Sequence, residues 1–280
     1  MEKVYGVIGD PIGHSLSPLM HNHSFAIENI QAAYHPFLVK KEDLESAVRG
    51  MKAIGIQGFN VTIPHKEAII PYLDEVDALA AEIGAVNTVV LRNGAYVGYN
   101  TDGIGFVKAL KQAIREVNVE QKKVLIIGAG GAAKGIYYSL LAEGFTNVDL
   151  ANRSVERARQ LISGSTHASS SLSNAYSMED AEENLNQYDI LIQTTSVGMS
   201  PRREESPLTL EKLNRQTHVF DIIYNPYETK FLTLAKEKGC SIHNGIDMFV
   251  YQGAFAFQLW TEIWPNTDEM RKVVINRLGG

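Results

Sequence analysis

The stretch KVLIIGAGGAA, residues 123–133, constrains the fold of this chain more than any other segment. Four apolar residues in a row, 124–127, predict a strand that is buried on both faces, as in a parallel sheet. Gly128, Gly130 and Ala133 then follow the spacing G-x-G-x-x-G/A, in which glycines allow a tight turn and a close approach of backbone to a pyrophosphate. A helix over 132–141 would direct free N–H groups at those phosphates. The segment predicts a dinucleotide site, although such a turn can also serve packing alone.

The next predicted strand, 148–151, indicates which dinucleotide is bound. An acidic residue at its end, about 20 residues after the glycines, would bind the ribose of NAD. This chain has Asn152, Arg153 and Ser154 there, with Arg157 one turn further on. Because a guanidinium offers a planar fork of donors that suits a 2′-phosphate, the sequence favours NADP. The alternative interpretation is that Ser154 only caps a helix and that the arginines are solvated.

Length, charge and cysteine content narrow the class of protein. A chain of 280 residues suggests two domains, and a formal net charge of -6 argues against nucleic acid or an anionic membrane as partner. The one cysteine, Cys240, excludes an internal disulfide, and no Cys/His cluster has zinc spacing, so we expect no metal. We see no signal sequence and no run approaching the ~20 apolar residues of a membrane span, and therefore expect a cytoplasmic protein.

Two serines follow the first predicted strand, residues 4–8. The loop 9–17, GDPIGHSLS, leads into a helix from about residue 18. Ser17 before Pro18 fits a helix N-cap followed by proline at the first helical position, which is a purely structural role. With Ser15 two residues earlier, the two hydroxyls would instead be able to bind a carboxylate at the helix N-terminus.

Residues 58–66, GFNVTIPHK, carry further polar candidates. Asn60 and Thr62 alternate with three apolar residues, so both polar side chains face away from the apolar row of a short strand. Pro64 ends this strand, and Lys66 follows in a turn that could open a short helix. A lone lysine is usually just solvated, so Lys66 needs partners before it indicates catalysis.

Those partners are predicted by residues 84–105. The strand GAVNTVV carries Asn87 and Thr88, and a hairpin through the turn dipeptide NG at 93–94 leads to Asp102 at the start of a helix. Gly105 would allow another surface to approach that helix closely. Asp102 can be interpreted as a helix cap, but a carboxylate and the Lys66 ammonium converging on one hydroxyl would form a proton-transfer pair.

Taken in order, these motifs resemble those of the shikimate dehydrogenase family. The resemblance rests on S-L-S-P at 15–18, N-V-T-I-P-H-K at 60–66, G-A-V-N-T at 84–88, N-T-D-G at 100–103, G-A-G-G-A-A at 128–133, N-R-S at 152–154, D-I-I-Y-N-P at 221–226 and N-G-I-D-M at 244–248. It implies a two-domain α/β fold. An N-terminal substrate domain, residues 1–103, would be completed by helices in 246–280, and a doubly wound Rossmann-type NADP-binding domain would span 104–245.

The resemblance also implies an activity and its residues. The activity is the reversible NADPH-dependent reduction of 3-dehydroshikimate to shikimate in aromatic amino-acid biosynthesis, by a monomer or homodimer, with Lys66 and Asp102 as the catalytic pair. The substrate positions fall on Ser15, Ser17, Asn60, Thr62, Lys66, Asn87, Asp102, Tyr224 and Gln252. The cofactor positions fall on Gly128, Ala129, Gly130, Gly131, Ala132, Asn152, Arg153, Ser154, Arg157, Ile222 and Gly245. Ser154 stands where the family commonly has threonine, and Ile222 where it often has methionine.

Two other functions remain open at this point. A quinate/shikimate dehydrogenase that uses NAD or NADP is disfavoured by Arg153 and by the missing acid at the end of the second strand. A non-catalytic NADP-sensing module is disfavoured because it would not need both Lys66 and Asp102. We further expect helices over 41–52, 75–83, 105–117, 248–263 and 268–278, and an exposed stretch of loop and helix over 163–187.

Overall fold

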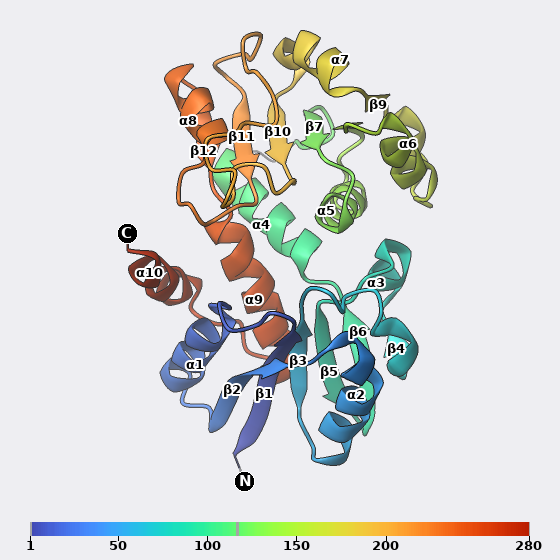
Figure 1. Ribbon diagram of the computed structural model, residues 1–280, viewed down its shortest axis with the longest axis vertical. Helices are drawn as coiled ribbons and strands as arrows, with labels where there is room; N and C mark the ends of the chain where they lie inside the picture. Colours follow the sequence, from blue (N-terminus) through green and yellow to red (C-terminus); the bar gives the residue numbers. More distant parts are fainter. Residues whose placement is uncertain (1, 116–117, 280) are drawn as a thin grey trace. The chain divides into compact units, whose positions relative to one another are not determined.

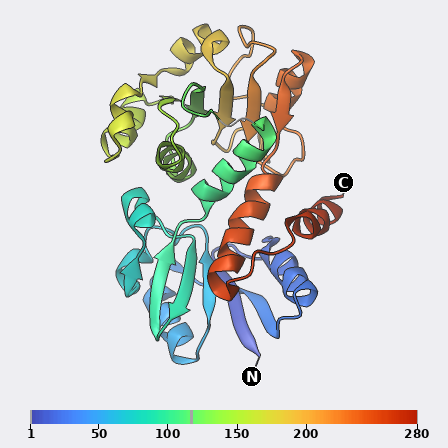
Figure 2. The same ribbon diagram turned by 180° about the vertical axis from the view of Figure 1, so that it is seen from behind.

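The computed structural model describes residues 2–115 and 118–279, and Figures 1 and 2 show it from opposite sides. The chain forms two compact units. The first comprises the chain up to Gly105 and again from Val250 onward, and the second comprises Phe106–Phe249. Two helices, α4 (Asp102–Ile114) and α9 (Ile246–Thr261), contribute residues to both units.

The first unit is built on a mixed six-stranded sheet in the order β2-β1-β3-β5-β6-β4. Its strands are β1 (Lys3–Gly9), β2 (Ala32–Leu38), β3 (Gly58–Val61), β4 (Glu75–Val76), β5 (Thr88–Arg92) and β6 (Ala95–Tyr99). β1 runs parallel to β3, whereas β5 runs antiparallel to both β3 and β6. The carboxyl ends of β1, β3 and β6 and the start of β5 therefore lie at one end of the sheet, which we call its functional edge. The predicted polar residues Asn60, Thr62, Lys66, Asn87 and Asp102 lie in these strand ends or in the segments next to them.

Helices cover both faces of this sheet. They are α1 (Ser17–Ile27), α2 (Leu44–Ala53), α3 (Ala78–Ile83), most of α9, and α10 (Thr267–Leu278). On one face, Val48 of α2 and Ala80 of α3 share an apolar core with Phe59 of β3. On the other face, the Trp260 ring of α9 packs against Tyr5 of β1 with ring centroids 5.1 Å apart. The sheet is thus buried on both sides, and only its edges are left for function.

The second unit is built on a parallel sheet of six strands in the order β12-β11-β10-β7-β8-β9. Its strands are β7 (Lys123–Ile127), β8 (Asn147–Ala151), β9 (Ala175–Tyr176), β10 (Ile190–Gln193), β11 (His218–Asp221) and β12 (Ser241–His243). Read from β9, the order along the chain is 3-2-1-4-5-6, which is the Rossmann order. The order in which the chain adds strands reverses between β7 and β10, and folds of this class bind ligands at such a switch point.

The helices of the second unit lie on both faces of its sheet. They are most of α4, α5 (Gly131–Ala142), α6 (Val155–Ser163), α7 (Met178–Glu183) and α8 (Lys230–Glu237). Phe231 of α8 shares a core with Val219 of β11, while the next strand residue, Phe220, meets Phe106 of α4 at 5.7 Å between ring centroids. Because successive strand residues point to opposite faces, the sheet is doubly wound. The predicted α/β fold with a Rossmann-type domain is confirmed.

Several predicted elements differ from the structure. Residues 41–43 form a 3-10 turn before α2, and residues 75–76 form β4 rather than the start of a helix, since Asp77 caps α3 by accepting from the Leu79 N–H at 3.1 Å. No α-helix begins at Lys66, because such a helix would have to continue through Pro71. The stretch 163–187 also contains β9. The predicted helix end at Val117 lies outside the described residues. Among those residues, no helix has the length and apolar character needed to span a membrane.

Candidate active site

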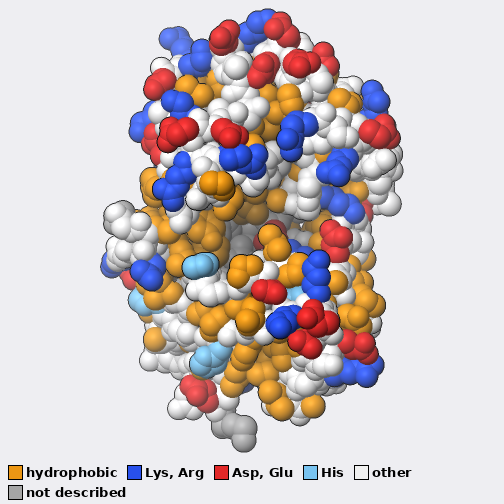
Figure 3. Space-filling model, viewed as in Figure 1, with side chains coloured by type: hydrophobic (Ala, Val, Ile, Leu, Met, Phe, Trp, Pro, Cys, Tyr) orange, Lys and Arg blue, Asp and Glu red, His pale blue; other side chains and the backbone are white. Residues whose placement is uncertain are grey.

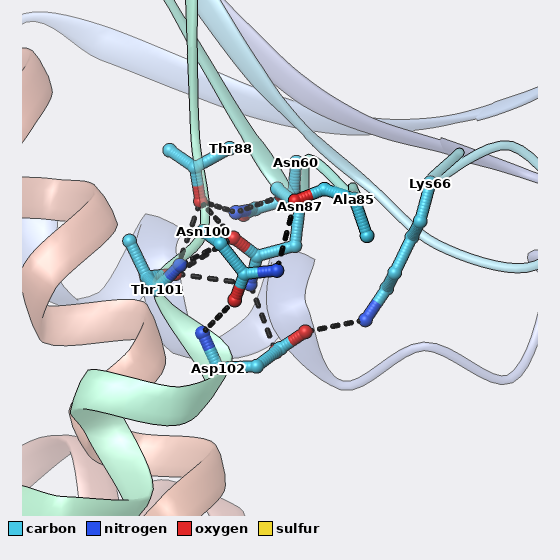
Figure 4. Close-up of polar contacts among 8 residues, drawn as sticks. All are labelled: Asn60, Lys66, Ala85, Asn87, Thr88, Asn100, Thr101 and Asp102. Atoms are coloured by element: carbon cyan, nitrogen blue, oxygen red, sulfur yellow. Dashed lines mark hydrogen bonds and ion pairs between the residues drawn. The ribbon is translucent and has the colours of Figure 1, made fainter. Parts of the chain in front are cut away.

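Lys66 and Asp102 form a close ion pair at the functional edge of the first sheet. Lys66 lies in the turn after β3, and Asp102 is the first residue of α4. Lys66 Nζ donates to Asp102 Oδ2 at 2.6 Å, and the two side chains are 33% and 21% exposed. Figure 4 shows the pair reaching toward each other from these two segments. A partly exposed ammonium held by a carboxylate still has protons to offer to a ligand.

Asn87 fixes the second oxygen of Asp102. Its amide Nδ2 donates to Asp102 Oδ1 at 2.8 Å, while its Oδ1 accepts from the Thr101 backbone N–H at 2.7 Å. A backbone N–H can only donate, so the oxygen of the Asn87 amide must face Thr101 and its nitrogen must face Asp102. Both Asp102 oxygens are therefore occupied by side chains, as Figure 4 shows. α4 begins at Asp102 itself, so Asp102 is its first helical residue and does not occupy the N-cap position.

Asn60 supports Asn87 from the neighbouring strand. Its Nδ2 donates to the Asn87 carbonyl oxygen at 3.1 Å and to Thr88 Oγ1 at 3.0 Å. Both residues are buried, with Asn60 6% and Asn87 2% exposed. The amide protons of both asparagines are thus engaged inside the protein. A ligand hydroxyl that binds here has to donate to their oxygens or displace one of these bonds.

Ser17 is not the N-cap that its sequence context suggests. α1 begins at Ser17 itself, its N-cap position is Leu16, and no side chain makes a capping bond there. The Ser17 backbone N–H instead donates to Ser15 Oγ at 3.3 Å. The two hydroxyls therefore lie together at the start of α1, with Ser15 half-buried and Ser17 buried.

The serine loop lies beside the end of β3. The Asp10 N–H donates to the Ile63 carbonyl oxygen at 3.0 Å. A Cβ on Gly9 would stand 2.5 Å from Thr62 Cγ2, so glycine is needed for this approach. The structure thus brings Ser15, Ser17 and Thr62 to the same sheet edge as Lys66.

Gln252 on α9 lies against the first turn of α4. A Cβ on Gly105 would stand 2.6 Å from the Gln252 backbone nitrogen, which confirms that Gly105 permits a close approach. Since Gly105 follows Asp102 by three residues, Gln252 lies within one helical turn of the ion pair. Tyr224, the remaining predicted substrate residue, belongs to the second unit, where its ring packs 5.2 Å from Phe249 and burial raises its pKa.

One residue of this site was missed by the sequence analysis. Tyr34 of β2 is 1% exposed, and its hydroxyl donates to Asn60 Oδ1 at 2.7 Å. Burial raises the pKa of Tyr34 well above its usual value, and a hydrogen bond from the Ser17 side chain opposes this rise. No motif marks Tyr34, because a tyrosine in a strand of apolar neighbours is normally core. Only its distance from Asn60 in three dimensions shows its place in the network.

In the second unit, the glycine turn has the geometry of a phosphate site. Gly128 has φ +114°, which favours glycine, and a Cβ there would stand 2.5 Å from Thr194 Oγ1. α5 begins at Gly131 and has no side-chain cap on its N-terminus. No atom lies within 4 Å of a Cβ built on Gly130 or Gly131. An uncapped helix N-terminus with room beside its first glycines suits a pyrophosphate.

The residues after β8 leave two arginines exposed. Ser154 occupies the N-cap position of α6, as the alternative interpretation expects, but its side chain makes no capping bond. Arg153 and Arg157 are exposed, and neither forms an ion pair with an acidic side chain in the described part of the chain. The Asn152 amide donates to the Ser154 carbonyl oxygen at 2.9 Å and so holds this turn. The guanidinium groups are free to meet an anion.

Ile222 and Gly245 are adjacent in the second unit. A Cβ on Gly245 would overlap the Ile222 carbonyl oxygen, so only glycine fits beside this backbone. The predicted cofactor residues after β11 and before α9 therefore belong to one local structure. Within the described ranges, no group of three or more His, Cys, Asp or Glu side chains is arranged to hold a metal ion.

Comparison with known proteins gives the family. The model of the shikimate dehydrogenase substrate binding domain matches residues 7–89, that of shikimate/quinate 5-dehydrogenase matches 109–230, and that of the shikimate 5′-dehydrogenase C-terminal domain matches 245–275. A curated relative from Bacillus cereus strain AH187, named shikimate dehydrogenase (NADP(+)), is 57% identical over 280 residues, which is 100% of both chains.

Solved structures agree with this comparison. A crystal structure of a shikimate dehydrogenase in complex with NADP+ is 40% identical, has a TM-score of 0.90, and is matched over 99% of this chain and 96% of that one. The shikimate 5-dehydrogenase of Thermus thermophilus in complex with NADP(H) and shikimate is 32% identical, with a TM-score of 0.87 and 99% of each chain covered. From its full-length relatives and its fold, this chain belongs to the shikimate dehydrogenase family.

Proposed function

We propose that this protein catalyses the reversible reduction of 3-dehydroshikimate to shikimate with NADPH. The observation that carries the proposal is the Lys66–Asp102 pair, 2.6 Å apart and braced by Asn87, in a member of the shikimate dehydrogenase family. A positioned ammonium next to a carboxylate is a competent proton-transfer pair. Its partly exposed position allows a ligand to reach it.

The reaction requires a hydride at the ketone carbon and a proton at the ketone oxygen. NADPH, when bound, supplies the hydride. Lys66 donates the proton to the oxygen as it becomes an alkoxide, and in the oxidation of shikimate it takes the proton back. Asp102 holds the Lys66 ammonium in place through the 2.6 Å bond and accepts a hydrogen bond from the neighbouring C4 hydroxyl. Asn87 keeps Asp102 in this orientation.

The other first-unit residues bind the rest of the substrate in this proposal. Ser15 and Ser17 bind the carboxylate, because their hydroxyls lie together at the start of α1. Thr62 and Gln252 bind ring hydroxyls, and Asn60 and Asn87 bind them by exchanging internal hydrogen bonds of their amides. Tyr224, which belongs to the second unit, is a further predicted substrate residue that rests on the family resemblance. The first unit is accordingly the substrate domain and the second the cofactor domain.

The second unit fits NADP. The open N-terminus of α5 at Gly130 and Gly131 suits the pyrophosphate, and the small side chains of Ala129 and Ala132 leave room beside it. Arg153 and Arg157 suit the 2′-phosphate, since both are exposed and the three residues directly after β8, 152–154, include no acid that would repel it. The backbone around Ile222 and Gly245 completes the site.

Two features support a small-molecule enzyme of the cytoplasm, which we propose as its location. The single cysteine, Cys240, is a buried free thiol, as a reducing compartment allows. Over α6, α7 and α8, Lys and Arg side chains are interspersed with Asp and Glu on the face seen in Figure 3. With a net charge of -6, such a face offers no continuous basic strip for nucleic acid.

Steady-state kinetics with two substrates and two cofactors test the proposed function. We expect NADPH formation from shikimate and NADP+ to have a higher kcat/KM than any combination with quinate or NAD+. Lys66→Ala should lower kcat by at least ~10²-fold, the lower end of what a positioned acid or base supplies. Lys52→Ala is the control, because Lys52 also pairs with an aspartate, Asp74 at 2.8 Å, away from this edge.

The possible outcomes separate the candidate functions. A preference for quinate would identify a quinate/shikimate dehydrogenase. Tight NADP+ binding without turnover of either substrate would identify a sensing module. A Lys66→Ala variant with the kcat of Lys52→Ala would remove Lys66 from the mechanism.

A further inference from the structure

A fully buried tyrosine supports the polar network of the site in the first unit. The Tyr34 hydroxyl donates to the side chain of Asn60, on β3. Asn60 in turn contacts the Asn87 backbone, and Asn87 contacts Asp102. Hydrogen bonds therefore connect Tyr34, through Asn60 and Asn87, with the proton-transfer pair.

One backbone carbonyl determines the direction of each hydrogen bond in this network. The Asn87 carbonyl oxygen can only accept, so the Asn60 nitrogen must face it, at 3.1 Å. The Asn60 oxygen then faces Tyr34 and needs a donor, which the phenol supplies at 2.7 Å. The phenol has a single proton, and the Asn60 oxygen takes it. Tyr34 and Asn60 therefore donate in one direction, toward Asn87.

We propose that Tyr34 is a positioning residue that holds the Asn60 amide in the one orientation that supports Asn87 and, through it, the Lys66–Asp102 pair. The identity of the reaction rests on the proposed function, but the positioning itself does not. Without the phenol, the buried Asn60 oxygen loses its donor, and one fewer hydrogen bond holds the amide against Asn87. The Tyr34 ring, stacked on His21 at 4.6 Å, would stay in place in a phenylalanine variant.

Tyr34→Phe tests the proposal, with Tyr96→Phe as the matched control. Tyr96 is also fully buried in the first unit, and its hydroxyl donates one bond, to the Ile56 carbonyl oxygen at 2.9 Å. The two variants therefore lose the same group from similar surroundings. We expect Tyr34→Phe to lower kcat/KM for shikimate about tenfold relative to Tyr96→Phe, the rate equivalent of one lost buried hydrogen bond. In an Asn60→Ala background, Tyr34→Phe should cause no further loss.

A second readout does not depend on any enzymatic activity. Hydrogen exchange of the Asn60 side-chain amide, followed by NMR in the full-length protein, should be about tenfold faster in Tyr34→Phe than in Tyr96→Phe. Equal exchange in the two variants would overturn the proposal, even if the protein proved not to be a dehydrogenase. So would equal kcat/KM values, or a Tyr34→Phe effect that persists undiminished in the Asn60→Ala background.

Discussion

Replacing Asp102 with asparagine should inactivate the site without disturbing its shape. The Asp102 carboxylate accepts from Lys66 Nζ at 2.6 Å and from Asn87 Nδ2 at 2.8 Å, and both partners can only donate in these positions. The Asn87 nitrogen cannot turn away, because the Thr101 N–H holds the other side of the amide at 2.7 Å. An asparagine at 102 therefore presents its NH₂ group to one of two donors and loses that bond.

The size of the effect follows from the bond that is lost. If the asparagine keeps its oxygen toward Asn87, the charge-assisted bond to Lys66 disappears. Hydrogen bonds to charged groups contribute roughly 1.5–3 kcal/mol. If that stabilisation acts on the transition state, kcat should fall about 10- to 150-fold. KM for shikimate should also rise, because Asp102 holds the C4 hydroxyl in the proposed mechanism.

The assay is the rate of NADPH formation with saturating NADP+, combined with thermal unfolding to verify that the variant is folded. Asp74→Asn is the control, since Asp74 forms the other Lys–Asp pair of this unit and is 42% exposed. It should leave kcat within about twofold of the wild-type value, as expected for a surface pair. A folded Asp102→Asn enzyme with unchanged kcat and KM would refute the reasoning, because the ion pair would then have no part in the reaction.

Three further predictions concern the second unit. Arg153→Ala combined with Arg157→Ala should raise KM for NADP+ strongly and leave KM for NAD+ nearly unchanged; equal weakening would show that the arginines support the fold or the pyrophosphate. Gly245→Ala should lower the melting temperature by several degrees, because its Cβ would overlap the Ile222 carbonyl oxygen; an unchanged melting temperature would contradict this packing. Burial raises the pKa of Asp221 from 3.8 to about 6. Because this folded-state pKa lies above the unfolded one, burial of Asp221 destabilises the fold fully above about pH 6, and the penalty is relieved as pH falls toward 3.8. The unfolding free energy of wild type relative to Asp221→Asn should thus rise by about 2.4 kcal/mol between pH 7 and pH 4; a flat difference in chemical denaturation would contradict it.

The strongest local signals predicted the fold well. The apolar run before Gly128 is fully buried in β7, and the glycine turn leads into α5 as expected. The turn between β5 and β6, at Asn93 and Gly94, has positive φ at both residues, as its hairpin sequence requires. Each of these features depends on neighbours in the sequence, which is why the sequence alone could predict them.

Elements held mainly by tertiary contacts could not be predicted. β4 and β9 have two residues each, so they carry too short a pattern to be recognised. Ser17 has the sequence context of an N-cap, but the helix starts one residue earlier than that context suggests, at Ser17 itself. The exact start of a helix depends on the backbone angles of one or two residues, and contacts with neighbouring loops can shift it by that much.

In the candidate site, too, local motifs could be predicted from the sequence, whereas long-range contacts could not. Lys66 and Asp102 are 36 residues apart, and their meeting follows from the antiparallel pairing of β3, β5 and β6, which brings the segments after β3 and β6 to one edge. Motif resemblance identified both residues. Tyr34 was missed because its role depends on a bond to Asn60 across the sheet, and no local pattern encodes that bond.

The central claim is that hydride passes between C3 of shikimate and the nicotinamide in this protein while Lys66 handles the proton. Incubation of the purified protein with NADP+ and shikimate deuterated at C3, followed by mass spectrometry of the NADPH formed, measures this transfer directly. We predict NADPH that carries the deuterium, and at least ~10²-fold slower formation of it by Lys66→Ala. NADPH free of deuterium, or no NADPH from a folded protein that binds NADP+, would contradict the claim.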